Sequence, residues 1–218
     1  MTKRSIKFLL VLLIMLFPLY AIAADEGFYL TISSGGSYVQ EIETDSSKGA
    51  FNIALNPGYA ASLAVGYDLG NEHPDLGRGR VDIEFSYRSN ELDEVEFVEA
   101  KSAGGGVLNV MSMMLTTYGI PEDHRGNWTP YFCLGVGAAK ITLDQATVAG
   151  SPLVDDSDWV LAGQVGMGSG YAISDHLTLD LGYRFFATSP PEFKDITGQK
   201  FDSEYYDHLF QAGIRVTF

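Results

Sequence analysis

The clearest alternation of apolar and polar side chains lies at the end of the chain, between residues 206 and 218. Every second position there is apolar or aromatic apart from one histidine, and the positions between are mostly polar or small. The first row consists of Tyr206, His208, Phe210, Ala212, Ile214, Val216 and Phe218. Because successive side chains of a strand point to opposite faces, this segment is predicted to be a β-strand with one apolar face.

The same alternation recurs upstream and predicts seven further strands. Their ranges are 28–33, 59–69, 81–88, 107–118, 128–143, 159–171 and 177–186. The segment 107–118 has apolar residues in both rows, so a short helix would fit it as well. Its threonines, the glycines at 104–106 and the alternating neighbours favour a strand.

The connections between these strands alternate in length. Shorter turns join the second strand to the third, the fourth to the fifth and the sixth to the seventh, and the other connections have about 14 to 24 residues. Barrels of the outer membrane have short turns on the periplasmic side and long loops outside. With an even strand count, both termini of the chain would lie on the periplasmic side.

The N-terminal residues have the features of a secretory signal peptide. Lys3, Arg4 and Lys7 precede an apolar run over 8–20, and Ala21-Ile22-Ala23 supplies small residues at a cleavage site. A transmembrane helix is the alternative, but the run contains Pro18 and is shorter than the roughly 20 residues of a span. We therefore expect a signal peptide over 1–23 and a mature domain over 24–218.

Composition narrows the class of protein. Loss of the three basic residues of the leader would lower the formal net charge from −14 to −17, which argues against nucleic acid as a partner. Beyond the leader no apolar segment is long enough for a membrane helix. In lipid only helices and closed barrels satisfy the hydrogen-bonding groups of the backbone, so a mature chain that spans the membrane has to be a closed barrel. The single cysteine, Cys133, excludes an intrachain disulfide and is interpreted as a packing residue. The predicted fold is all-β: a closed, antiparallel, up-and-down, eight-stranded transmembrane β-barrel.

Several segments resemble the eight-stranded barrels of OmpA-like, opacity-type surface antigens. They are Gly58-Tyr59 with Val65-Gly66-Tyr67, residues 129–132 with 135–137, residues 170–185, and the ending over 213–218. The resemblance implies residence in the outer membrane among its lipids. It also implies that Phe210, Ile214, Val216 and Phe218 serve as the signal read by the barrel-assembly machinery.

The predicted inward row carries charged residues. A candidate lumen cluster consists of Asp82, Glu84, Arg88, Asp180, Arg184 and Arg215, with Asp68 and Asp207 on the same face. Side chains fill a barrel of this size, and buried charges have to be paired or hydrated. We expect Arg184 and Arg215 to lie among Asp82, Glu84 and Asp180 and to seal the lumen. An ion path, or a small apolar ligand cavity beside the inward glycines, is the alternative.

Aromatic residues near the predicted strand ends fit the two interfacial girdles of a membrane barrel. One girdle would hold Tyr67, Trp128, Tyr171 and Phe218, and the other Tyr59, Tyr87, Trp159 and Phe185.

The long connections are acidic, and we expect them to form solvated extracellular loops. Their carboxylates are Glu41, Glu43, Asp45, Glu91, Asp93, Glu94, Glu96, Glu99, Asp144, Asp155, Asp156, Asp158, Glu192, Asp195, Asp202 and Glu204. Such a surface would repel anions and could attract a basic or cationic extracellular ligand. Its spacing is not that of an EF-hand, so no metal site is assigned.

The histidines do not assemble a catalytic set. His73, His124 and His176 fall in predicted periplasmic turns, and His208 points outward by parity. We therefore expect no catalysis and no cofactor. The expected function is that of a monomeric outer-membrane protein with a plugged polar interior and a structural or surface-interaction role. The alternative is a narrow, porin-like channel for small solutes or ions.

Overall fold

The computed structural model describes residues 27–45, 51–70, 79–97, 100–121 and 126–218. The strands are β1 (Phe28–Val39), β2 (Ile42–Asp45), β3 (Phe51–Leu55), β4 (Gly58–Asp68), β5 (Gly79–Phe97), β6 (Ala100–Gly119), β7 (Trp128–Val148), β8 (Ser151–Ser174), β9 (Leu177–Thr188), β10 (Glu192–Lys194), β11 (Lys200–Ser203) and β12 (Tyr206–Thr217). The predicted signal peptide lies outside the described residues. Within them, no helix has the length and apolar character needed to cross a membrane.

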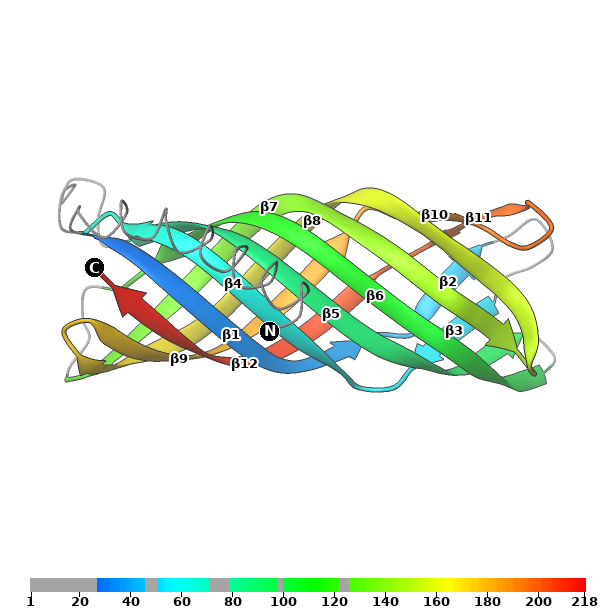
Figure 1. The fold of residues 1–218 in the computed structure, drawn as a ribbon, viewed down its shortest axis with the longest axis horizontal. Helices are drawn as coiled ribbons and strands as arrows, with labels where there is room; N and C mark the ends of the chain where they lie inside the picture. Colours follow the sequence, from blue (N-terminus) through cyan, green and yellow to red (C-terminus); the bar gives the residue numbers. More distant parts are fainter. Residues whose placement is uncertain (1–26, 46–50, 71–78, 98–99, 122–125) are drawn as a thin grey trace, which may run out of the picture.

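The long strands close into a ring (Figure 1). Going round it, β1 pairs with β4, β4 with β5, and each of β5 to β8 with the strand that follows it. β8 then pairs with β9, β9 with β12, and β12 with β1. Every pairing is antiparallel, so the predicted eight-stranded, up-and-down β-barrel is confirmed.

The outer surface of the ring is apolar. The exposed side chains include Ile32, Leu63, Phe85, Leu115, Leu134, Val136, Leu161 and Ile214, and Leu161 is 75% exposed. A water-soluble monomer rarely exposes so continuous an apolar surface, whereas a membrane barrel presents such a band to lipid. Exposed aromatic residues lie toward both ends of the band, among them the Trp128–Tyr171 pair, whose ring centroids are 4.9 Å apart, and the Tyr59–Tyr87 pair at 6.0 Å.

The structure explains why the segment 107–118 has no clear alternation. In β6, Met111, Met113 and Leu115 point outward and are exposed, while Val110 and Met114 point inward and are buried. Both rows are apolar here because β6 has lipid on one side and a part of the interior that is itself apolar on the other.

The expectation that the long acidic connections are loops is wrong for most of their described residues. β5 and β6 continue the barrel to Phe97 and from Ala100, and β7 and β8 form a hairpin whose turn is Ala149-Gly150. Four short strands stand beyond the other barrel strands, and β10 pairs with β11, β11 with β2, β2 with β3, and β3 with β5. We call these four short strands, together with the extended ends of β5 to β8, the distal barrel. It lies at the right of Figure 1, away from the C-terminus.

The distal barrel closes between β8 and β10 in an unusual way. One isolated bridge joins Val154 on β8 to Asp195, the residue that follows β10. Nearby, the Asp156 carboxylate accepts hydrogen bonds from the backbone of Ser157 on its own strand, at 2.8 Å, and of Lys194 on β10, at 2.9 Å. Asp158 spans the gap in the same way between Trp159 and Glu192, at 2.8 and 3.0 Å. Along this seam, two carboxylates therefore accept hydrogen bonds that backbone carbonyls would accept in a regular sheet. Asp156 and Asp158 thus have a structural role.

The interior has two parts. Apolar side chains fill it at the distal end, among them Ile42, Ile53, Leu92, Leu108, Ile141, Leu143, Val154, Phe193 and Phe201, all at most 5% exposed. Charged and polar side chains fill it toward the C-terminal end. The expected polar interior is thus found toward the C-terminal end but not in the distal half, because the inward rows of the extended strands change there from polar to apolar residues.

Candidate functional site

The six residues of the candidate lumen cluster all point into the barrel. Asp82, Glu84 and Arg88 come from alternate positions of β5, Asp180 and Arg184 come from β9, and Arg215 comes from β12. The first five are buried and Arg215 is half-buried. The alternation of the strands therefore places each of them correctly, but they do not form one cluster. They divide into three layers along the barrel axis.

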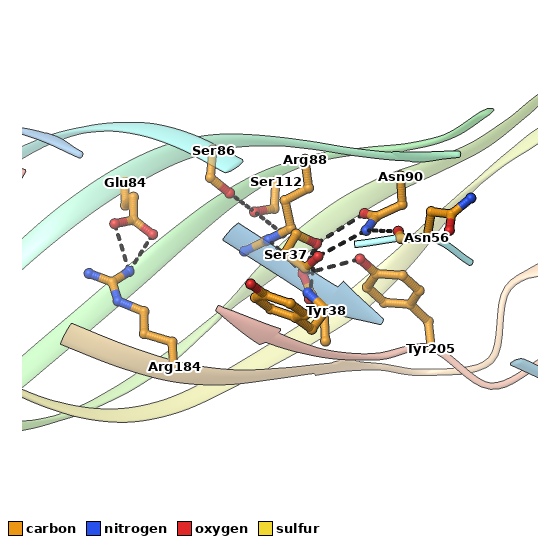
Figure 2. A network of polar contacts seen from close by, with 11 residues as sticks. Ser37, Tyr38, Asn56, Glu84, Ser86, Arg88, Asn90, Ser112, Arg184 and Tyr205 are labelled. Atoms are coloured by element: carbon orange, nitrogen blue, oxygen red, sulfur yellow. Dashed lines mark hydrogen bonds and ion pairs between the residues drawn. The ribbon is translucent and has the colours of Figure 1, made fainter. Parts of the chain in front are cut away.

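The middle layer is the ion pair between Arg184 and Glu84 (Figure 2). Arg184 Nη1 lies 2.5 and 2.6 Å from the two carboxylate oxygens, and Nη2 donates to the Tyr118 hydroxyl at 3.0 Å. Beside the pair, the Gln164 amide donates to Thr116 Oγ1 at 2.9 Å. The arginine fork thus has acceptors on both arms, which is the arrangement that makes a buried charge tolerable.

The layer nearest the C-terminal end combines a second ion pair with an aromatic cage. Arg215 Nε lies 3.0 Å from Asp180 Oδ2, and the Tyr29 hydroxyl donates to Asp82 Oδ2 at 3.2 Å. Arg80 lies among three tyrosine rings, with Cζ 4.6, 5.1 and 5.6 Å from the centroids of Tyr118, Tyr131 and Tyr29. A guanidinium over aromatic faces is held by cation–π attraction, so rings and charges pack together at this end of the interior.

Arg80 is not among the inward residues predicted from the sequence, because the predicted strand starts at Val81, whereas β5 begins at Gly79. The signal was present, because Arg80 stands two positions before Asp82 and four before Glu84, in the same inward row.

The third layer joins Arg88 to Asp207 rather than to the other carboxylates. Arg88 Nε lies 3.4 Å from Asp207 Oδ2, and Arg88 Cζ lies 3.8 Å from the centroid of the Phe186 ring. Asp207 also accepts hydrogen bonds from Ser37 Oγ and from the backbone of Tyr38, both at 3.0 Å. Arg88 was grouped with Asp82 and Glu84 by its position along β5, but its partner comes from β12.

An asparagine supports this layer near the end of β1 and the start of β4 (Figure 2). Asn90 Nδ2 donates to the backbone carbonyls of Ser37, at 3.1 Å, and of Asn56, at 3.2 Å.

Tyr205, just before the start of β12, also contacts this layer. Burial raises the pKa of Tyr205, and the nearby Asp207 carboxylate raises it further. The Tyr205 hydroxyl therefore stays protonated and lies 3.4 Å from Asp207 Oδ2 as its donor.

The space left between the middle and third layers is very small. Ser33, Ala60 and Ser86 line a cavity of about 10 Å³ together with Glu84, Arg88 and Arg184. That volume is about what one water molecule needs. One water molecule there would lie beside the charged groups of Glu84, Arg88 and Arg184.

Glycines make room for the large side chains of the interior. A Cβ at Gly168 would lie 2.5 Å from Cζ of Tyr131, and one at Gly182 would lie 3.0 Å from the hydroxyl of the same tyrosine. The inward glycines of β8 and β9 thus form the surface on which Tyr131 rests. This packing leaves little space for the small ligand cavity that the sequence left open.

The remaining predicted residues take the following positions. Phe210 and Ile214 are exposed on the outer face of β12, and Val216 and Phe218 are half-buried. Cys133 is buried against Tyr118 and Tyr131. His208 lies on the outer face and His176 is exposed, while His73 and His124 fall outside the described residues. No group of three or more potential metal ligands occurs in the described part of the chain.

The comparison with protein families decides the class of this barrel. Residues 9–218 match the family model of the outer membrane protein beta-barrel domain. This chain belongs to that family. It is therefore an outer-membrane β-barrel, and its exposed apolar band faces lipid.

Solved structures of similar fold agree with the family. Neisserial surface protein A is 17% identical, with a TM-score of 0.52, and the match covers 88% of this chain and 97% of that one. The outer membrane protein OprG of Pseudomonas aeruginosa is 12% identical, with a TM-score of 0.51 and coverage of 89% and 98%. At these identities the likeness shows the fold alone. No curated protein sequence gave a significant match.

A third structure of similar fold is an enzyme. The outer membrane protease OmpT of Escherichia coli is 9% identical, with a TM-score of 0.53 and coverage of 89% and 98%. Fold alone therefore does not decide whether this barrel is catalytic. That the chain has no enzymatic activity stays a prediction from the placement of its histidines.

Proposed function

We propose that this protein is a sealed outer-membrane barrel with a structural or surface-interaction role, which displays its distal barrel outside the cell. The observation that carries the proposal is the filled interior. Ion pairs and tyrosine rings occupy one half, apolar side chains occupy the other, and the cavity between two of the polar layers has about 10 Å³.

The two parts of the interior resist opening for different physical reasons. To pass the polar layers, a solute would have to separate buried charges such as Glu84 and Arg184, and each would lose its partner in a medium of low dielectric. To pass the distal part, it would have to part side chains such as Leu108 and Ile141, which pack without room for water. A seal made of both does not depend on any single pair.

The outer surface of the distal barrel would be the part that meets partners. Exposed carboxylates such as Asp93, Asp155 and Asp202 outnumber the lysines there. Lys200 forms an ion pair with Glu192, whose hydrogen bond raises the pKa of the lysine, and Lys101 lies 2.8 Å from Glu96. Exposed pairs of this kind add little stability. Because carboxylates outnumber lysines on this surface, its electrostatic potential is negative, which favours basic or cationic extracellular partners over anionic ones.

The route to the membrane is part of the same proposal. The signal peptide would direct export and be removed by cleavage after Ala23. The outward residues Phe210, Ile214, Val216 and Phe218 near the C-terminus would be read by the barrel-assembly machinery. The ring of pairings is complete within one chain, which supports a monomer as the working form.

Recordings across planar lipid bilayers test the sealed interior. The purified full chain should give no steady open level, because both halves of the lumen are filled. Arg184→Met should also stay closed, since the distal apolar layer does not involve this residue. A steady open level in the wild-type protein would favour the narrow channel. An open level in the variant alone would show that the polar layer is the only seal.

A further inference from the structure

The outer face of β1, β9 and β12 carries a cluster of aromatic and polar side chains where the apolar band meets the distal barrel. We call it the rim patch; it consists of Tyr38, Gln40, Tyr183, Phe185, His208 and Phe210. The strands are direct neighbours, since His208 is paired with Tyr38 on one side and Phe185 on the other. Gln40 follows the end of β1, so the patch lies at the distal limit of the lipid-facing surface.

A chain of hydrogen bonds runs through the rim patch. Tyr183 Oη lies 2.8 Å from His208 Nδ1, and His208 Nε2 lies 2.8 Å from Gln40 Nε2. If the Gln40 amide donates to Nε2, then Nδ1–H donates to Tyr183, which keeps its own O–H for an outside acceptor. If the Gln40 amide is turned round, its oxygen accepts from Nε2–H, and its N–H groups point to an outside acceptor instead. In both arrangements the hydrogen-bonded groups of Tyr183, His208 and Gln40 leave a donor for a molecule beside the barrel.

Aromatic rings surround these polar groups. The ring centroids of Tyr38 and Phe210 lie 5.8 Å apart, and Phe210 and Tyr183 lie 5.1 Å apart. Tyr38 is 46% exposed and Phe210 is 56% exposed, so their surfaces are available. In contact with hydrocarbon, the polar groups would lack hydrogen-bond partners outside the protein. In contact with water, the apolar surface of the rings would stay exposed. A sugar ring suits both, because its hydroxyls form hydrogen bonds and its C–H faces pack on aromatic rings.

The charges near the patch argue against an anionic ligand. Glu41 and Glu204 are exposed beside it along the chain. Lys140, the outward lysine of the transmembrane strands, is on β7, whose partners are β6 and β8 rather than the strands of the patch. Phosphate groups bind where arginine or lysine can pair with them. A neutral headgroup therefore fits the patch better than a phosphate.

We infer that the rim patch binds the neutral sugar headgroup of a glycolipid in the leaflet that surrounds the distal end of the barrel. The site is a surface for one lipid class at the membrane interface, where aromatic side chains are already favoured. It does not depend on whether the lumen is sealed, and neither the family nor the similar structures assign it.

Native mass spectrometry of the full chain in detergent micelles tests this inference. The probes are a monoglucosyl diacylglycerol and, for comparison, phosphatidylglycerol with the same acyl chains. The wild-type barrel should retain the glucosyl lipid in preference to the anionic one. The double variant Gln40→Leu with His208→Leu should bind the glucosyl lipid about tenfold more weakly, because two neutral hydrogen bonds are lost.

Matched variants and a soluble sugar separate the possible outcomes. Asn109→Leu removes a different outward polar contact, between Asn109 and Tyr87, and should leave lipid binding unchanged. Tyr38→Leu removes an exposed ring of the patch but keeps the hydrogen bonds among Gln40, His208 and Tyr183. It should weaken binding and provides a second test if the double variant does not fold. Equal loss in Asn109→Leu, equal retention of phosphatidylglycerol, or unchanged binding in the rim variants would overturn the inference. So would methyl glucoside binding as tightly as the lipid, because the site would then serve a free sugar.

Discussion

Replacing Arg184 by methionine should lower the free energy of unfolding by about 3 to 5 kcal/mol, the usual cost of breaking a buried ion pair from one side. The methionine keeps much of the side-chain volume, so the main effect is that Glu84 stays buried without its cation. Arg184 Nη1 makes contacts of 2.5 and 2.6 Å with that carboxylate. Urea-induced unfolding in lipid vesicles, followed by the fluorescence of Trp128 and Trp159, measures the change.

Two further variants show whether the loss comes from the unpaired charge. Combining Arg184→Met with Glu84→Met should recover most of the stability, because apolar residues can replace a buried pair at little cost. Lys101→Met breaks an exposed pair with Glu96 and should change stability by at most about 1 kcal/mol. A single Arg184 variant as stable as the Lys101 variant would contradict the role given to the middle layer.

Gly137→Val should prevent most of the chain from reaching the folded barrel. A Cβ at this position would press into the backbone carbonyl oxygen of Met113 on the paired strand, and also into Sδ and Cα of Met114. Ordinary overpacking costs about 1 to 3 kcal/mol where side chains can move aside. The carbonyl oxygen belongs to the β6–β7 ladder and cannot move without breaking it, so we expect a larger loss.

Gly163→Ala on the adjacent strand is the matched control. The nearest atom to a Cβ at Gly163 is the carbonyl oxygen of Gly135, at 4.0 Å. This variant should fold like the wild type, since alanine enters open space. The fraction of folded protein is measured by gel mobility with and without boiling, because folded outer-membrane barrels resist detergent. Equal yields of the two variants would show that Gly137 is not needed for close strand approach.

The transmembrane part of the fold follows from alternation alone. In β4, β9 and β12 the contrast between lipid-facing and inward residues is sharp, so both the strands and their orientation could be predicted. The contrast fades in β6, where Val110 and Met114 face an apolar interior. It fades again in the distal barrel, where acidic residues face water on the outside and the strands look like polar loops.

The carboxylates expected around Arg184 and Arg215 include their partners, Glu84 and Asp180. Which charge pairs with which could not be predicted, because alternation gives the direction of a side chain but not its height in the barrel. Arg88 and Glu84 are near neighbours on β5, yet one pairs with Asp207 on β12 and the other with Arg184 on β9. The stagger between strands decides such pairings. The carboxylate contacts of Asp156 and Asp158 across the seam depend in the same way on the path of β10, which its few residues do not reveal.

The single cysteine provides the most direct test of a sealed interior without any substitution. Cys133 points into the barrel and lies against Tyr118 and Tyr131, with 7% of its surface exposed. A small, charged thiol reagent added to the folded protein in detergent or vesicles should leave Cys133 unmodified for hours, and urea-unfolded protein should react fully. Rapid modification of the folded barrel would contradict the sealed interior, because it would show that water and solutes pass the layer of rings and charges nearest the C-terminal end.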